Sequence, residues 1–178
     1  QLLDAVSEKK TFGLVWEEKE EEAQERLREE LPVFVEDESK RIVNSDDAPN
    51  HVIIEGDNLH ALTALSYSHE GKFDAIYIDP PYNTGNKDFV YNDSYVDSED
   101  SYRHSKWLNM IKHRLVIAKR LLNPDNSVLI VTIDEKEYLH LGCLLEEMFP
   151  NAKMQMITSV INPSGTMRGD EFSRVEEY

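Results

Sequence analysis

The chain has 178 residues and a formal net charge of −16 at pH 7, with 19 lysines and arginines against 35 aspartates and glutamates. This length suits one domain, and the single cysteine excludes an internal disulfide framework and a cysteine-rich zinc site. The acidic balance argues against a chain that binds DNA by itself, because DNA affinity depends largely on cationic contacts to phosphates. No apolar run reaches transmembrane length, so we expect a cytoplasmic protein without a membrane partner.

The first 50 residues are predicted to form an acidic helix and a connector. Glu17 to Leu31 consists almost wholly of good helix formers with a thin apolar stripe, and Pro32 ends this helix. Residues 33 to 50 form a polar connector. We expect the helix to expose most of its surface to solvent, with binding to a protein partner as the alternative.

Two strands and the helix between them are predicted next. His51 to Glu55 is the first strand, and Asp57 is placed to cap a helix from Asn58 to Ser68. Phe73 to Ile78 is apolar except for Asp74 and short enough to be a buried strand of a parallel sheet.

The strand from Phe73 to Ile78 ends abruptly at Asp79, which two prolines follow. Proline supplies no backbone N–H and cannot continue a central strand, so the chain leaves the sheet at the strand's carboxyl end. Open α/β sheets place their ligands at this edge. We therefore expect the residues from Asp79 to Tyr82 to line a crevice.

The remaining chain continues the alternation. Asn83 to Asp97 is a long polar and aromatic loop, either a flap over a substrate or a surface loop anchored by its aromatic side chains. Ser98 to Leu122 is the strongest helix, with Ser98 as its cap and one apolar face. That buried face contains Trp107, Leu108, Ile111, Leu115, Ala118 and Leu122.

Further strands are predicted from Ser127 to Ile133 and from Met154 to Ile161. The helix between them, Glu135 to Phe149, holds Cys143, which we expect to be a small core residue. The pattern as a whole predicts a three-layer α/β fold, with a mostly parallel sheet covered on both faces.

The tetrapeptide from Asp79 to Tyr82 suits an exocyclic amine of a nucleobase, whose lone pair is delocalised into the ring. Two acceptors that grip the amine hydrogens, Asp79 and the Pro80 carbonyl, favour a pyramidal nitrogen with a usable lone pair. Tyr82 is suited to stack on a base swung out of the duplex. The alternative is a plain loop start, because Asp and Pro are ordinary turn residues.

Three longer stretches carry a resemblance to a known family: IEGDNLHAL from Ile54, YIDPPYNTGNKDF from Tyr77 and YNDSYVDSEDSYRHSKWL from Tyr91, with RL and LL pairs after them. They closely resemble the modification subunits of type III restriction-modification systems, which are DNA adenine-N6 methyltransferases of the β arrangement. The resemblance covers nearly the whole chain, and its run from Gly56 to Leu122 is highly specific.

The resemblance implies methyl transfer from S-adenosylmethionine to a flipped adenine in double-stranded DNA. The subunit would partner a restriction (Res) subunit and form a homodimer in the full-length protein. The residues implied in catalysis are Asp79, Pro80, Pro81 and Tyr82; in cofactor binding Asp57, Asn58 and Asp79; and in substrate binding Asn83, Thr84 and Gly85. An aspartate at a helix start is also often just a cap, so Asp57 keeps both interpretations. No metal is implied, because no cluster has ligand spacing.

In the β arrangement a target-recognition region and a glycine-rich cofactor loop follow the catalytic segment, and no Gly-x-Gly loop follows a strand here. We therefore expect residues 1–50 to be an extension and residues 51–178 the N-terminal part of a Rossmann-like methyltransferase domain. That domain would be incomplete in this chain and inactive alone. Two alternatives stay open: a cytosine-N4 or other amino-methyltransferase of the same fold, and a non-catalytic acidic interaction domain.

Overall fold

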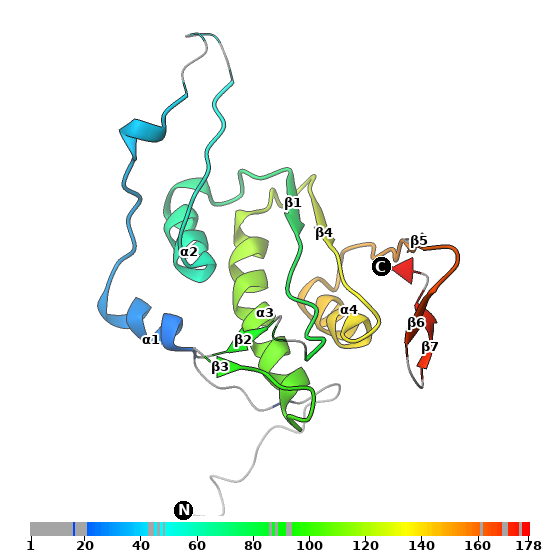
Figure 1. Ribbon diagram of the computed structural model, residues 1–178. Helices are drawn as coiled ribbons and strands as arrows, with labels where there is room; N and C mark the ends of the chain where they lie inside the picture. Colours follow the sequence, from blue (N-terminus) through cyan, green and yellow to red (C-terminus); the bar gives the residue numbers. More distant parts are fainter. Residues whose placement is uncertain are drawn as a thin grey trace, which may run out of the picture.

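A computed structural model describes residue 16 and residues 21–42, 45, 47, 49–85, 87, 89–91, 94–160, 162–168, 171–174 and 176–178. Figure 1 shows a long central helix, α3 (Arg103–Leu121), with α2 (Asn58–His69) on one side and α4 (Tyr138–Met148) on the other. The strands β1 (Ala75–Ile78) and β4 (Val128–Val131) lie beside this helix and pack against the same core. The chain is a mixed helix and strand domain.

The core forms around α3 because apolar residues recur on one of its faces. Trp107, Leu108, Ile111 and Leu115 are no more than 3% exposed. Side chains from the loop after β1 and from α4 complete the cluster, among them Phe89, Tyr91, Leu141 and Leu144. Burying one such side chain contributes about 1.5–3 kcal/mol. The predicted apolar face of this helix is confirmed.

The start of α3 differs from the prediction that Ser98 caps it. The helix begins at Arg103, and residues 98 and 99 lie in a turn. The carboxylates of Asp97 and Asp100 accept hydrogen bonds from the backbone N–H groups of Glu99 and Tyr102, at 2.9 Å and 2.8 Å. Because these side-chain bonds satisfy the backbone locally, the chain turns there before the helix starts.

The strands β1 and β4 form a parallel pair, in which Ile78 lies opposite Val131. The segment between them contains α3, so the unit has the strand–helix–strand order expected from the sequence. Both strands are shorter than predicted. They are also not buried on both faces: Ile78, Leu129 and Val131 pack against the core, whereas Tyr77 on the other face is 64% exposed. Burial of the sheet on two sides is therefore not observed in the described part of the chain.

Two of the predicted strands are wrong or much shorter. Residues 51–55 form no strand and are all exposed, with Ile53 at 95%, since no strand among the described residues pairs with them. Within the described part of the strand predicted from Met154 to Ile161, only β5 (Ser159–Val160) forms, antiparallel to β8 (Glu176–Glu177), and Ile161 lies outside the described residues. Hydrophobic, β-branched composition alone does not make a strand without a pairing partner.

The remaining strands are short and antiparallel. The predicted loop after Asn83 contains a hairpin of β2 (Val90–Tyr91) and β3 (Ser94–Tyr95). A second hairpin pairs β6 (Thr166–Arg168) with β7 (Glu171–Arg174). Tyr178 then returns to the end of β4, where its N–H and carbonyl group bond the backbone of Ile133 at 3.0 and 2.9 Å.

The other helices follow the sequence more closely. α1 spans Glu22–Glu29 and ends before Pro32 as predicted, while residues 17–20 of the predicted helix lie outside the described residues. Asp57 caps α2, accepting from the N–H groups of Leu59 and His60. α4 begins at Tyr138, later than predicted, because residues 135–137 form a turn. Cys143 in α4 is exposed, so its prediction as a core residue is wrong.

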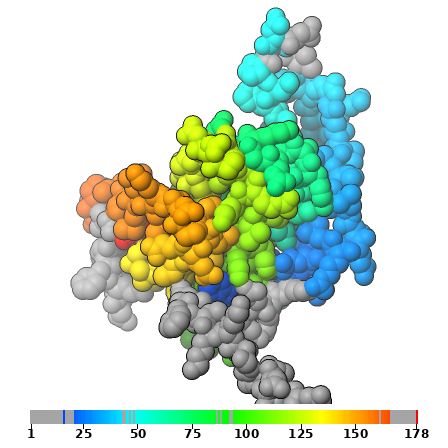
Figure 2. Space-filling model, turned by 180° about the vertical axis from the view of Figure 1, so that it is seen from behind, coloured from blue at the N-terminus to red at the C-terminus, as the bar shows by residue number. Residues whose placement is uncertain are grey.

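The segment between α1 and α2 extends away from the compact body formed by α2, α3 and α4, as the cyan region of Figure 2 shows. It contains one short 3-10 helix, η2 (Glu38–Lys40), and its apolar residues Val35 and Ile42 are 88% and 85% exposed. Its prediction as a polar connector agrees with this exposure. None of the helices in the described part of the chain combines the length and apolar composition needed to span a membrane.

Candidate active site

Asp79 and Thr132 lie side by side where β1 and β4 end. Because the parallel register pairs Ile78 with Val131, the next residue of each strand emerges at the same edge of the sheet. The Thr132 hydroxyl donates a 2.7 Å hydrogen bond to Oδ1 of Asp79. Asp79 is exposed and has no ion pair among the described residues. Thr132 thus orients a carboxylate that stays accessible.

The two prolines that follow have different surroundings. Pro80 is buried, and within the described chain its carbonyl oxygen accepts no hydrogen bond. The carbonyl oxygen of Pro81 accepts a 2.6 Å hydrogen bond from Nε1 of Trp107 in α3. Of the two proline carbonyl groups, that of Pro80 is the one to which the described chain donates no hydrogen bond.

Tyr82 comes next and is half-buried. Its ring packs against the hydrophobic cluster around Trp107. The core therefore fixes the position of the ring, while part of its surface remains accessible.

Asn83 holds the chain in an unusual backbone conformation at the end of this segment. Its φ is +58°, in the left-handed region that asparagine tolerates better than most residues. The side chain is buried, and its Nδ2 donates to Oε1 of Glu137 at 2.5 Å and to the Arg103 carbonyl oxygen at 3.3 Å. Asn83 is therefore a fixed point between the loop, α3 and the start of α4.

Gly85 is required by close packing. Its φ is +84°, and a Cβ at this position would lie 2.6 Å from Cβ of Ser98 and 2.8 Å from its Cα. Any side chain would therefore meet backbone as well as adopt a strained φ. Thr84 beside it is half-buried. Asn83, Thr84 and Gly85 thus determine the path of the chain after the tetrapeptide.

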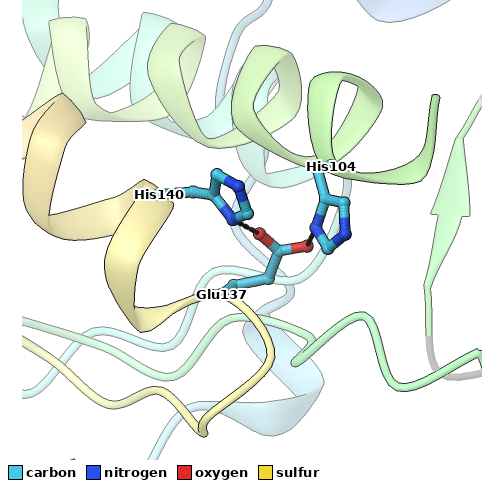
Figure 3. A group of neighbouring side chains, drawn as sticks. All are labelled: His104, Glu137 and His140. Carbon is cyan, nitrogen blue, oxygen red and sulfur yellow. Dashed lines mark hydrogen bonds and ion pairs between the residues drawn. The ribbon is translucent and has the colours of Figure 1, made fainter. Parts of the chain in front are cut away.

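A cluster of His104, Glu137 and His140 was not predicted from the sequence (Figure 3), and its Glu137 accepts the hydrogen bond from Asn83. His104 comes from α3, whereas Glu137 and His140 come from the start of α4. Only the spacing Glu-x-x-His hints at it, because the third member lies 33 residues earlier. Thr132 was missed for the same reason, since its contact with Asp79 depends on the strand register.

Comparison with known proteins identifies the type of domain that carries this geometry. Residues 73–178, the larger part of the chain, match a protein family described as DNA methylase. The chain belongs to the DNA methylase family.

Curated relatives of this methylase-family chain include modification subunits. The probable type III restriction-modification enzyme HindVI Mod subunit of Haemophilus influenzae is 41% identical over 127 residues, 71% of this chain and 16% of the relative. The type III EcoPI Mod subunit of Escherichia phage P1 is 30% identical over 197 residues, 96% of this chain and 30% of the relative. The resemblance to type III modification subunits expected from the sequence is confirmed.

A type II enzyme is also similar. The methyltransferase M.KpnI of Klebsiella pneumoniae is 36% identical over 118 residues, which cover 65% of this chain and 28% of the relative. The chain spans less than a third of the length of each of these three relatives.

The predicted cofactor residues of this methylase-family chain, Asp57 and Asn58, are exposed at the start of α2. Asp57 caps the helix through Oδ1, and Oδ1 of Asn58 accepts a 2.6 Å hydrogen bond from Nε of Arg114. Both side chains already have partners from the chain, and the pocket between α1 and α3 is lined by neither of them. These contacts give both residues a structural role, and their predicted contact with S-adenosylmethionine stays a prediction.

In the loop that follows the tetrapeptide of this methylase-family chain, two aromatic side chains are buried in the core and one is exposed. Phe89 and Tyr91 are buried in the core, and the Tyr91 hydroxyl accepts a 2.7 Å hydrogen bond from Nδ2 of Asn109. Burial raises the pKa of Tyr91. Tyr95 is 60% exposed. This agrees with a loop anchored by its aromatic side chains, and of the three only Tyr95 is placed to contact a ligand.

The basic side chains along α3 of this methylase-family chain contact other residues of the chain and do not form a free basic surface. Lys106 pairs with Asp100, and hydrogen bonding to Lys106 lowers the pKa of that carboxyl. Arg114 pairs with Glu21 at 2.9 Å, and Nζ of Lys112 lies 5.3 Å from the Trp16 ring centroid. These basic side chains of α3 therefore contribute mainly to contacts within the chain.

Proposed function

We propose that this chain carries the target-amine site of a DNA methyltransferase that modifies N6 of adenine, in the modification subunit of a type III restriction-modification system. Membership in the DNA methylase family and similarity to type III Mod subunits support this. The observation that carries the proposal is the geometry at the end of β1. An accessible Asp79, oriented by Thr132, precedes a Pro80 carbonyl that no described residue occupies.

This pair of acceptors suits an amine attached to an aromatic ring. The carboxylate of Asp79 and the carbonyl oxygen of Pro80 each accept one hydrogen from the exocyclic nitrogen. With both hydrogens held, the nitrogen becomes pyramidal and its lone pair is directed away from the ring. Because the acceptors belong to a segment held by Thr132 and Trp107, they are in place before the base arrives.

The base must leave the duplex for its amine to reach these acceptors. Tyr82, anchored on the core with part of its ring accessible, is the group proposed to stack on the extruded adenine. We propose no proton transfer to Asp79 during the reaction, because the methylated ammonium product is acidic enough to lose its proton to water. Pro81 acts through its bond to Trp107, which holds the tetrapeptide in place.

S-adenosylmethionine is the proposed methyl donor, in keeping with the family. The acceptors at the start of α2 serve the fold, so we propose that groups outside the described residues supply most of its binding site. The same proposal takes residues 51–178 as part of a Rossmann-like domain and residues 1–50 as its extension. A Res subunit, a second copy of the protein and double-stranded DNA are the proposed partners.

Methylation of cytosine N4 is the second candidate, because the matched family joins N6 and N4 methylases and the two amines present the same two hydrogens. The test is methyl transfer by the protein at its natural length to duplexes that carry target adenine or only cytosine, with mass analysis of the digested nucleosides. We expect N6-methyladenine from the wild type and none from Asp79→Ala. N4-methylcytosine would overturn the choice of base, and equal activity of the two proteins would overturn the site and favour a non-catalytic interaction domain.

A further inference from the structure

In the cluster of His104, Glu137 and His140, the two histidines lie on either side of the Glu137 carboxylate, which is completely buried. Glu137 is 0% exposed, and its Oε1 accepts hydrogen bonds from Nδ1 of His104 at 2.7 Å and from Nδ2 of Asn83 at 2.5 Å. Nδ1 of His140 lies 2.9 Å from Oε2, outside hydrogen-bond geometry. Figure 3 shows both imidazole rings turned toward this one carboxylate.

Two histidines and a carboxylate are also the composition of a transition-metal site. The hydrogen bonds around His104 favour a different role. Nε of Arg103 donates to Nε2 of His104 at 3.2 Å, so Nε2 carries the lone pair and Nδ1 carries the hydrogen that Glu137 accepts. A cation on Nδ1 would require the other tautomer, the loss of the Arg103 bond and a position near the guanidinium charge. The cluster is therefore a hydrogen-bonded network.

A buried carboxylate is unfavourable unless donors surround it. Removing one of the donors leaves part of the cost of burying the charge without compensation. Here the two donors come from separate segments, Asn83 after β1 and His104 in α3, while the ring of His140 in α4 lies beside the other carboxylate oxygen. Glu137 thus ties the loop that follows the tetrapeptide to both helices. Asn83 is also the residue in the left-handed conformation, which this contact holds in place.

The tetrapeptide and Asn83 are anchored at alternate residues. Asp79 is bonded to Thr132 after β4, Pro81 to Trp107 in α3, and Asn83 to Glu137 before α4. In an extended segment, successive residues point to opposite sides and alternate residues to the same side. The Pro80 carbonyl and the Tyr82 ring lie between these three anchored residues, so their placement depends on the anchors.

We propose that Glu137 is a positioning residue for methyl transfer, which holds Asn83 and so sets the placement of the Pro80 carbonyl and the Tyr82 ring. This inference rests on the proposed function. Misplacement of reacting groups by about 1 Å can cost 100-fold in rate. We expect Glu137→Ala to lower kcat by about 10- to 100-fold while KM for DNA changes less than about threefold, since the residue touches neither base nor phosphate.

A reciprocal exchange tests the contact itself in the protein at its natural length. Asn83→Asp places a second carboxylate against Glu137, and we expect kcat to fall at least as far as in Glu137→Ala. The double variant Asn83→Asp with Glu137→Gln reverses donor and acceptor across the same contact, and we expect it to regain at least about tenfold of the lost kcat. Glu147→Gln, on the exposed part of α4, is the matched control and should keep the wild-type kcat.

Several results would overturn the proposal. One is a wild-type kcat in both single variants. Another is a double variant that is no faster than Asn83→Asp although its thermal unfolding midpoint matches the wild type. Stoichiometric Zn²⁺ binding that Glu137→Gln abolishes would identify a metal site instead. The proposed function fails separately, because it requires Asp79→Ala to be inactive whatever the Glu137 variants do.

Discussion

Nε1 of Trp107 donates a 2.6 Å hydrogen bond to the carbonyl oxygen of Pro81, which joins the centre of the hydrophobic core to the segment of the candidate active site. Trp107 is 0% exposed. Buried polar groups almost always have hydrogen-bond partners. The packing of α3 and the path of the tetrapeptide therefore depend on one another.

Trp107→Phe tests this link, because it removes the donor and reduces the size of the ring. We expect the free energy of unfolding to fall by about 2–3 kcal/mol in urea denaturation, with slower methyl transfer in the protein that remains folded. Tyr102→Phe is the control, since Tyr102 is 63% exposed, and should stay within about 0.5 kcal/mol of the wild type. A similar small change for Trp107→Phe would contradict the link.

The hydroxyl of Thr132 is expected to affect activity through the carboxylate it orients. Thr132→Val removes the bond to Asp79 while keeping a branched side chain, and we expect kcat to fall by about tenfold, as for a bond to a charged group. Thr132→Ser retains the hydroxyl and should keep most of the rate. Steady-state methylation kinetics measure both, and equal rates for the valine and serine variants would show that the hydroxyl does not matter.

Gly85 and Gly142 form a matched pair for testing the close approach to Ser98. Gly85→Ala should destabilise the protein by about 2–4 kcal/mol, because the new Cβ meets the Ser98 backbone and φ is positive. Gly142→Ala in α4 meets no atom within 4 Å and should stabilise by about 0.5–1 kcal/mol. Urea denaturation measures the change in the free energy of unfolding for both variants. Changes of the same sign would contradict the prediction.

Glu21 makes the stability depend on pH in the acid range. Burial alone would raise its pKa, but hydrogen bonds from His113 and Arg114 outweigh burial and lower the pKa below its ordinary value of 4.5. The folded state therefore holds this proton less tightly than the unfolded chain. The resulting stability is present above pH 4.5 and is lost as the pH falls through the lower folded pKa. Chemical denaturation at a series of pH values should show that the free energy of unfolding falls less steeply with acid in Glu21→Gln than in the wild type. The same dependence on pH in both proteins would refute this.

The sequence predicted those parts of the fold that depend on local chemistry. Asp57 caps α2 as predicted, and Trp107 and Leu115 lie on the buried face of α3. The two prolines end β1 next to Asp79, at the carboxyl end of a parallel strand. Caps, periodicity and chain breakers act within a few residues, so they can be read without a structure.

The missed features depend on neighbours distant in the sequence. Residues 51–55 have the composition of a strand, but no strand in the part of the chain that the structure describes pairs with them. Thr132 reaches Asp79 only because of the register between β1 and β4. Glu137 meets Asn83 and His104 across 54 and 33 residues, so no local spacing reveals the contact.

Single-turnover methyl transfer by Asp79→Ala, in the protein at its natural length with saturating duplex DNA and S-adenosylmethionine, tests the central claim most directly. Asp125→Ala, an exposed aspartate in the turn before β4, is the control. If Asp79 grips the amine, its loss should slow the chemical step by about 100- to 1,000-fold, the usual effect of removing one oriented hydrogen-bonding group, with DNA affinity and the control rate unchanged. A rate for Asp79→Ala within tenfold of the control would contradict the account.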